Sequence, residues 1–204
     1  EIASVAGEIR NGLIKLIVTR GSGGRGYRPQ VGMNATRILM TYPLPTEPDI
    51  LTRAGGIRVG TAATRLARQP WLAGLKHLNR LEQVLAAGEP GEFEERVMLD
   101  TEGNVIDGTM MNLFLIERGV LITPDLSMAG VAGIMRRRII ELAATVGIQC
   151  EERDVQPAEL ERADEVFMCN AVRGIRSVIR IDNRPLEVGS VTGRLSAALA
   201  GVWP

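Results

Sequence analysis

The chain has 204 residues, 45% of them hydrophobic and 24% charged, enough for the core and surface of one large or two small domains. Its 24 basic and 24 acidic side chains give no net charge. The chain as a whole therefore has no excess of positive charge that would attract nucleic acid or an acidic membrane surface. One histidine and two cysteines outside any CxxC pair predict no metal site, and no apolar run reaches the length of a membrane span. These features predict a globular protein of the reducing cytoplasm.

The chain opens with a helical pattern. Apolar residues at helical spacing within 1–10, with no initiating Met, predict that a part of the protein precedes Glu1. The β-branched run at 13–20 predicts a strand buried on both faces, and 37–42 predicts a second strand. Between them GSGGRG, residues 21–26, matches G-x-G-x-x-G. A dinucleotide loop opens a helix, whereas this segment leads to a strand, so it predicts a hairpin loop.

Arginines gather around this glycine-rich loop. Arg20, Arg25 and Arg28 lie close to Tyr27 in the sequence, and planar guanidinium groups bind carboxylates through paired hydrogen bonds. The loop is therefore a candidate carboxylate-binding site. A flexible hairpin loop without a ligand is the alternative.

A proline-rich segment divides the chain. Its three prolines predict an extended linker at 43–50, so residues 1–42 are expected to end a small N-terminal domain and residues 51–204 to form a larger one. Antiparallel-looking strands among separate helices predict an α+β fold. The expected elements of the larger domain are a strand at 57–64, a helix at 77–88 with Leu78, Leu81, Val84 and Leu85 on its apolar face, a β-meander at 96–123, a helix at 132–147, a strand at 148–155, a helix at 157–163, strands at 165–170 and 177–181, and a helix at 188–201.

Lys76 is unusual because 22 of the 24 basic residues are arginine and the only other lysine is Lys15. It follows the apolar stretch WLAGL, which favours a partly buried position, and a buried lysine must neutralise, pair or form a covalent bond. Lysine can lose its proton and act as an amine nucleophile or a base, which arginine cannot. Lys76 is therefore a candidate catalytic residue. A surface lysine is the alternative.

Three arginines at 136–138 begin the helix expected at 132–147, where the helix dipole disfavours cations. A bound anion would remove this penalty. Gly133 allows close backbone approach, and the free amides of Ile134 and Met135 would point at a phosphate. The alternative is that the arginines are solvated or paired with acidic residues.

Four other polar residues are ambiguous by themselves. Asp107 lies where a strand meets a glycine, and Asn112 and Asn170 border apolar strands, where such residues commonly satisfy local backbone groups. His77 points away from Lys76 if the helix begins at residue 77, so His77 is expected to be structural.

Five segments together carry a resemblance to a known family. They are TRGSGGRGY, LAGLKHLNRLEQVL, EGNVIDGTMMNLF, GIMR and ADEVFMCNA. On these segments the chain resembles the fold-type IV (branched-chain aminotransferase-like) pyridoxal-phosphate enzymes over essentially all of residues 1–204. The resemblance implies a fold-type IV structure with a mixed, mostly antiparallel, barrel-like sheet, pyridoxal 5′-phosphate as the cofactor, and a homodimer.

The resemblance also implies roles for individual residues. Lys76 matches the lysine that holds the cofactor aldehyde as a Schiff base and then transfers the proton. Asp107 falls where the family usually has a longer glutamate paired with the pyridine nitrogen, so the ring or backbone must lie closer or a water must intervene. The residues matched to the cofactor phosphate are Gly133, Ile134 and Met135 in one segment and Asn170 and Ala171 in another.

Within the family the segments most resemble those of members that cleave 4-amino-4-deoxychorismate to 4-aminobenzoate and pyruvate in folate synthesis. This activity implies that Arg25 and Tyr27, helped by Arg20 or Arg28, bind the two substrate carboxylates. An aminotransferase for branched-chain or D-amino acids is the first alternative. A non-catalytic relative or fragment is the second.

Overall fold

The computed structural model describes residues 2, 7, 12–44 and 56–202. The chain divides into two compact units, residues 1–48 and 49–204, and each is described by itself. The helix expected at the start of the chain and most of the expected linker lie outside the described residues.

The first unit contains an antiparallel hairpin of β1 (Gly12–Thr19) and β2 (Thr36–Pro43). The glycine-rich segment joins the two strands, so the predicted hairpin loop is confirmed. The prediction that β1 is buried on both faces is wrong, because Leu16 is 48% and Val18 59% exposed. A two-stranded ribbon covers neither of its own faces, and the described residues of this unit supply no second layer.

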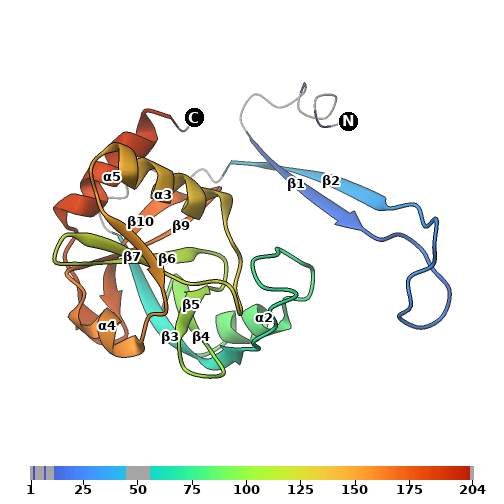
Figure 1. The fold of residues 1–204 in the computed structure, drawn as a ribbon, viewed down its shortest axis with the longest axis horizontal. Coiled ribbons are helices and arrows are strands. Elements are labelled where there is room, and N and C mark those ends of the chain that lie inside the picture. The colour runs from blue at the N-terminus through green and yellow to red at the C-terminus, as the bar shows by residue number, and fades with distance from the viewer. Residues whose placement is uncertain (1, 3–6, 8–11, 45–55, 203–204) are drawn as a thin grey trace. The chain divides into compact units, whose positions relative to one another are not determined.

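The second unit is built on a nine-stranded sheet with the order β5-β4-β3-β10-β9-β6-β7-β8, and β11 pairs with β10 beside this path (Figure 1). The pairs β3–β4, β3–β10 and β7–β8 are parallel, and the other five are antiparallel. The predicted α+β fold with a mixed, mostly antiparallel sheet is confirmed. The strands are β3 (Ile57–Leu66), β4 (Glu95–Asp100), β5 (Val105–Gly108), β6 (Asn112–Glu117), β7 (Val120–Pro124), β8 (Cys150–Arg153), β9 (Glu165–Asn170), β10 (Gly174–Ile181) and β11 (Arg184–Pro185).

Strands β4 to β7 form two hairpins rather than the predicted β-meander. β5 lies at the end of the strand order beside β4, whereas β6 pairs with β7 and β9. β6 and β9 are both apolar and buried, and they align Phe114 opposite Phe167 with stacked rings whose centroids are 4.9 Å apart. The meander prediction was wrong because alternation identifies strands without identifying their partners.

Helices α3 (Ile134–Thr145) and α5 (Ser190–Ala200) lie side by side against β9 (Figure 1). The short helix α4 (Pro157–Arg162) follows β8. Helix α2 (Leu81–Ala87) contacts β3 and β4, and it begins later than the predicted residue 77 because the backbone of its N-cap, Arg80, is not helical. Among the helices of the described residues, none has the length and hydropathy that would be needed to cross a membrane.

The apolar face predicted for α2 is not covered by the described residues of its own unit. Leu81, Val84 and Leu85 are 70, 64 and 63% exposed, and Leu78 before the helix is also exposed. Ala86 is the residue of α2 that is buried. The apolar pattern therefore predicted which residues share a face, but not which face meets the sheet.

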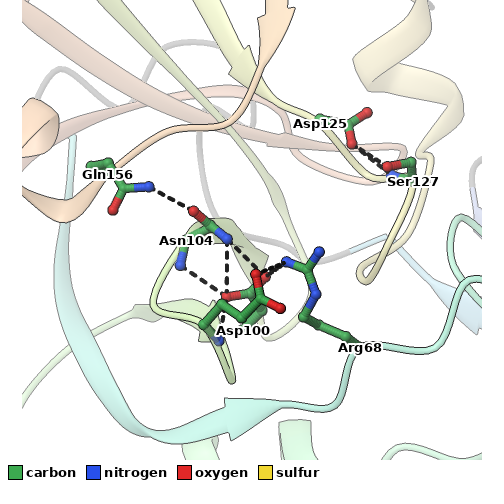
Figure 2. Close-up of polar contacts among 7 residues, drawn as sticks. Arg68, Asp100, Asn104, Asp125, Ser127 and Gln156 are labelled. Carbon is green, nitrogen blue, oxygen red and sulfur yellow. Dashed lines mark hydrogen bonds and ion pairs between the residues drawn. The ribbon is translucent and has the colours of Figure 1, made fainter.

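A hydrogen-bond network fixes the turn between β4 and β5 (Figure 2). Asp100 accepts the Asn104 amide at 2.8 Å and the Arg68 guanidinium at 2.6 Å, and Gln156 donates to Asn104 Oδ1 at 2.6 Å. Burial raises the pKa of Asp100, but hydrogen bonds from Asn104 and Arg68 outweigh that effect and hold the pKa below its usual range. The turn fixes the start of β5, whose third residue is Asp107.

Candidate active site

A short backbone bridge brings the Lys76 loop beside the segment that leads into α3. Gly74 and Val131 form an isolated parallel bridge. Gly74 donates its N–H to the Gly130 carbonyl and its own carbonyl accepts the Ala132 N–H, both at 3.0 Å. Because the bridge is parallel, the two segments leave it in the same direction, one toward Lys76 and the other toward the start of α3.

Lys76 lies in an exposed loop between this bridge and α2. The prediction of a partly buried lysine is wrong, because Trp71, Leu72 and Leu75 of the preceding apolar stretch are themselves exposed on a surface turn. The ammonium group nevertheless lies close enough to Asp107 for its charge to lower the pKa of that carboxyl group. The Lys76 amine is therefore accessible and is electrostatically coupled to a buried carboxylate.

Asp107 is only 4% exposed, near the end of β5. Its Oδ2 accepts the Val131 N–H at 3.0 Å, whereas its Oδ1 has no hydrogen-bond partner in the described structure. Burial raises the pKa of Asp107 to about 7; the Val131 hydrogen bond and the charges of Arg80 and Lys76 oppose this rise, and the Glu95 charge adds to it. A buried carboxylate oxygen without a donor is costly, so Oδ1 is suited to a ligand that presents a cationic N–H.

The start of α3 provides free backbone amides. Gly133 is the N-cap in extended conformation, and a Cβ at this position would overlap Asn112 Oδ1. The Asn112 side chain is held there because its Nδ2 donates to the Val131 carbonyl at 2.7 Å. The amides of Ile134 and Met135 have no acceptor within the helix, and the Ile134 side chain is exposed. This geometry can bind a phosphate or another anion.

The arginines at the start of α3 do not mark this anion site. Arg136 is buried and donates to Thr123 Oγ1 at 3.1 Å, to the Pro124 carbonyl at 2.9 Å and to Glu152 at 2.8 Å. Its two neighbours, residues 137 and 138, form ion pairs with Glu141. Of the two alternatives, the structure shows the one in which these arginines are paired, because protein acceptors and acidic partners already stabilise them. The candidate anion-binding groups are the backbone amides.

Asn170 ends β9, and Ala171 begins the turn that leads to β10. Asn170 Oδ1 accepts the amides of Val172 and Arg173 at 3.0 and 2.8 Å, which fixes the turn around Ala171. The residue before Asn170 lies opposite Asn112 in the β9–β6 pair. The structure therefore brings this turn next to the Asn112 contact at the start of α3, as a common phosphate site requires.

The four residues predicted to bind substrate carboxylates lie in the hairpin loop of the first unit. Arg20, Arg25, Tyr27 and Arg28 are all exposed. Arg20 lines a hollow of the loop together with Met33, and the other three lie outside that hollow. Their role in substrate binding stays a prediction.

Two charged residues beside Asp107 were missed by the sequence analysis. Arg80 precedes α2, and Glu95 is buried in β4, where it accepts the Thr109 amide at 2.9 Å. Glu95 lies on β4, which pairs with β5, and its charge raises the pKa of Asp107; the pairing of the two strands brings them together. Among the described residues, no three His, Cys, Asp or Glu side chains gather as a metal site would require.

Comparison with protein families gives this geometry a context. The family model described as amino-transferase class IV matches residues 1–181. The chain belongs to the class IV aminotransferase family. The fold-type IV architecture inferred from the resemblance is thereby confirmed for the chain.

Relatives within the class IV family include lyases and aminotransferases. The structure of 4-amino-4-deoxychorismate lyase from Pseudomonas aeruginosa is 44% identical with a TM-score of 0.92, covering 98% of this chain and 74% of that one. Aminodeoxychorismate lyase from Vibrio harveyi is 37% identical over 190 residues, which are 92% of this chain and 70% of the relative. A putative branched-chain-amino-acid aminotransferase from Methanocaldococcus jannaschii is 32% identical over 194 residues, 92% of this chain and 66% of the relative.

Proposed function

We propose that this chain carries the active site of a pyridoxal-phosphate-dependent lyase that converts 4-amino-4-deoxychorismate to 4-aminobenzoate and pyruvate. The observation that carries the proposal is the buried, unpartnered Oδ1 of Asp107 beside an accessible Lys76 and a helix start with free amides. The identities of 44% and 37% to two lyases of this substrate support the choice of reaction.

The site residues fit pyridoxal 5′-phosphate. Lys76 would hold the cofactor through its side-chain amine, and Asp107 Oδ1 would pair with the protonated ring nitrogen. The phosphate would lie against the amides that follow Gly133 and against the Asn170–Ala171 turn. When bound, the cofactor supplies an electron sink for the negative charge that develops beside the substrate nitrogen.

The protein's own groups then have separate tasks. The Lys76 amine accepts the proton from the substrate carbon that bears nitrogen, and its exposed loop gives it access to that position. Asp107 keeps the ring nitrogen protonated when its carboxylate is ionised. Arg25 and Tyr27, helped by Arg20 or Arg28, bind the two substrate carboxylates. Loss of the enolpyruvyl group makes the substrate ring aromatic, so the protein chiefly positions the proton acceptor and the dianion.

The experiment that tests this function compares two reactions of the full-length protein. With 4-amino-4-deoxychorismate we expect equal amounts of pyruvate and 4-aminobenzoate. With branched-chain or D-amino acids and 2-oxoglutarate we expect little turnover. Transamination without pyruvate release would favour the aminotransferase alternative, and no turnover in either reaction would favour the non-catalytic one.

Gly133→Ala tests the phosphate-binding segment. The added methyl overlaps Asn112 Oδ1 and forces that side chain off the Val131 carbonyl, so we expect a loss of about 1–3 kcal/mol in stability and at least tenfold weaker binding of pyridoxal phosphate. Thermal unfolding and cofactor titration measure the two effects. Gly193→Ala in α5 is the matched control, since its Cβ meets no atom within 4 Å. Equal behaviour of the two variants would contradict the assignment of Gly133.

We also propose that the protein is a cytoplasmic homodimer that acts in folate synthesis. The exposed apolar residues of α2 support an association, because contiguous apolar patches commonly mark interaction surfaces. The mass in solution from light scattering tests the dimer. A monomer at micromolar concentration would contradict it.

A further inference from the structure

Arg80 forms a clamp on the lysine loop, because its side chain donates to the backbone carbonyls of the two residues that flank Lys76. Its Nε donates to the His77 carbonyl at 2.9 Å, and one terminal nitrogen donates to the Leu75 carbonyl at 3.0 Å. Both acceptors belong to residues adjacent to Lys76 in the sequence. One planar guanidinium group therefore fixes the backbone before and after the lysine, which a single ammonium group could not do in the same way.

The clamp is anchored on a helix. Arg80 is the N-cap of α2, and its carbonyl accepts the Val84 N–H at 3.0 Å in the first helical turn. The Arg80 backbone is thus tied to α2, while its side chain reaches back to the loop. On the other side, the loop is tied to the segment before α3 through Gly74. Lys76 lies between these two attachments.

Arg80 also acts on Asp107 through its charge. Of the two cations near the carboxyl group, Arg80 lowers the pKa of Asp107 more than Lys76 does. The other groups that face Asp107 are the Val131 N–H, which also lowers the pKa, and the Glu95 carboxylate, which raises it. Arg80 is therefore the largest cationic influence that favours the ionised form of Asp107.

We propose that Arg80 is a positioning residue of the lyase site, which holds the backbone on both sides of Lys76 through the Leu75 and His77 carbonyls. This proposal rests on the proposed function for its consequence in catalysis. The clamp and the charge effect are properties of the protein without its cofactor, so both can be measured separately from turnover.

Two substitutions separate the effect of the planar guanidinium group from the effect of its positive charge. Arg80→Met removes both the guanidinium group and the charge, whereas Arg80→Lys keeps the charge without the planar group. Arg180→Met is the matched control, because Arg180 also bonds a backbone carbonyl, that of Asp182 at 2.5 Å, on an exposed hairpin that contains none of the proposed site residues. All are made in the full-length protein.

In the cofactor-free variants, hydrogen exchange of the Gly74 and Leu75 amides and the carbon-13 titration of the Asp107 carboxyl group are measured. We expect at least tenfold faster exchange in both Arg80 variants. We expect a titration midpoint above the wild-type value in Arg80→Met only. In the loaded enzyme, kcat should fall about 10- to 100-fold with KM little changed, since small displacements of a catalytic group cost this much.

If the amides exchange at the wild-type rate in both Arg80 variants, the proposed role of Arg80 in holding the lysine loop is wrong. If the titration midpoint of Asp107 is unchanged in Arg80→Met, the charge of Arg80 does not act on that carboxyl group. Arg180→Met should match the wild type in every measurement. If Arg80→Met does not fold, Arg80→Lys still tests the clamp. Failure of the proposed function would appear differently, as a wild-type protein that releases no pyruvate while these cofactor-free measurements keep their expected pattern.

Discussion

Lys76→Ala is expected to remove the visible absorption of protein-bound pyridoxal phosphate and to lower lyase turnover at least ~10³-fold, because the same amine holds the cofactor and accepts the proton. Alanine leaves the exposed loop free of strain, so folding should be unchanged. Absorption spectra of the loaded protein and release of pyruvate measure the two effects. An unchanged absorption band in the variant would remove Lys76 from the mechanism.

The chain contains its own control for this prediction. Lys15 is the only other lysine, and it is exposed on β1. Lys15→Ala should keep both the absorption band and the turnover. Borohydride reduction of the loaded wild-type protein followed by peptide mapping should place the cofactor on the peptide that contains Lys76. Label on the Lys15 peptide instead would contradict the assignment.

Asp107→Asn is expected to lower turnover about 10²- to 10³-fold, the usual cost of losing one charge-stabilising group in an active site. The same change should stabilise the cofactor-free protein at alkaline pH. The pKa of Asp107 is raised from 3.8 to about 7, so between these values the folded protein binds more protons than the unfolded chain. The free energy of unfolding therefore falls by up to about 4 kcal/mol as the pH rises between these two pKa values. It stays at the lower value at higher pH.

Thermal unfolding at pH 4, 6 and 8 measures this stability effect. The variant should match the wild type near pH 4 and exceed it increasingly toward pH 8, because asparagine carries no charge to bury. Asp154→Asn, at an exposed position, is the control and should show no such increase. A variant that is less stable than the wild type by the same amount at every pH would show that Asp107 acts only as an acceptor for Val131.

Local patterns in the sequence predicted most strands and helices of the second unit, because apolar periodicity depends on near neighbours in the chain. Their partners were less predictable. The predicted meander became two hairpins when β6 paired with β9, and the apolar face of α2 remained exposed. The first outcome depends on contacts between segments that are distant in the sequence, and the second depends on which face of a helix meets a sheet.

The candidate site divides in the same way. The sequence by itself determined the rarity of Lys76, the family resemblance and the residue types at Asp107 and Gly133. Lys76 is exposed rather than partly buried, and the arginines at 136–138 are paired, which is one of the two alternatives that the sequence left open. Solvent exposure and ion pairing depend on surrounding segments, so neither outcome could be predicted from neighbours in the chain.

Only the tertiary structure decided which groups meet. The bridge between Gly74 and Val131 joins the lysine loop to the start of α3, and burial leaves one Asp107 oxygen without a donor. Arg80 became important because its side chain folds back onto the lysine loop while its charge reaches Asp107. Hydrogen-bond partners and desolvation depend on positions in space. The sequence therefore predicts which chemical groups are present, but not which of them form hydrogen bonds or act on one another's charge.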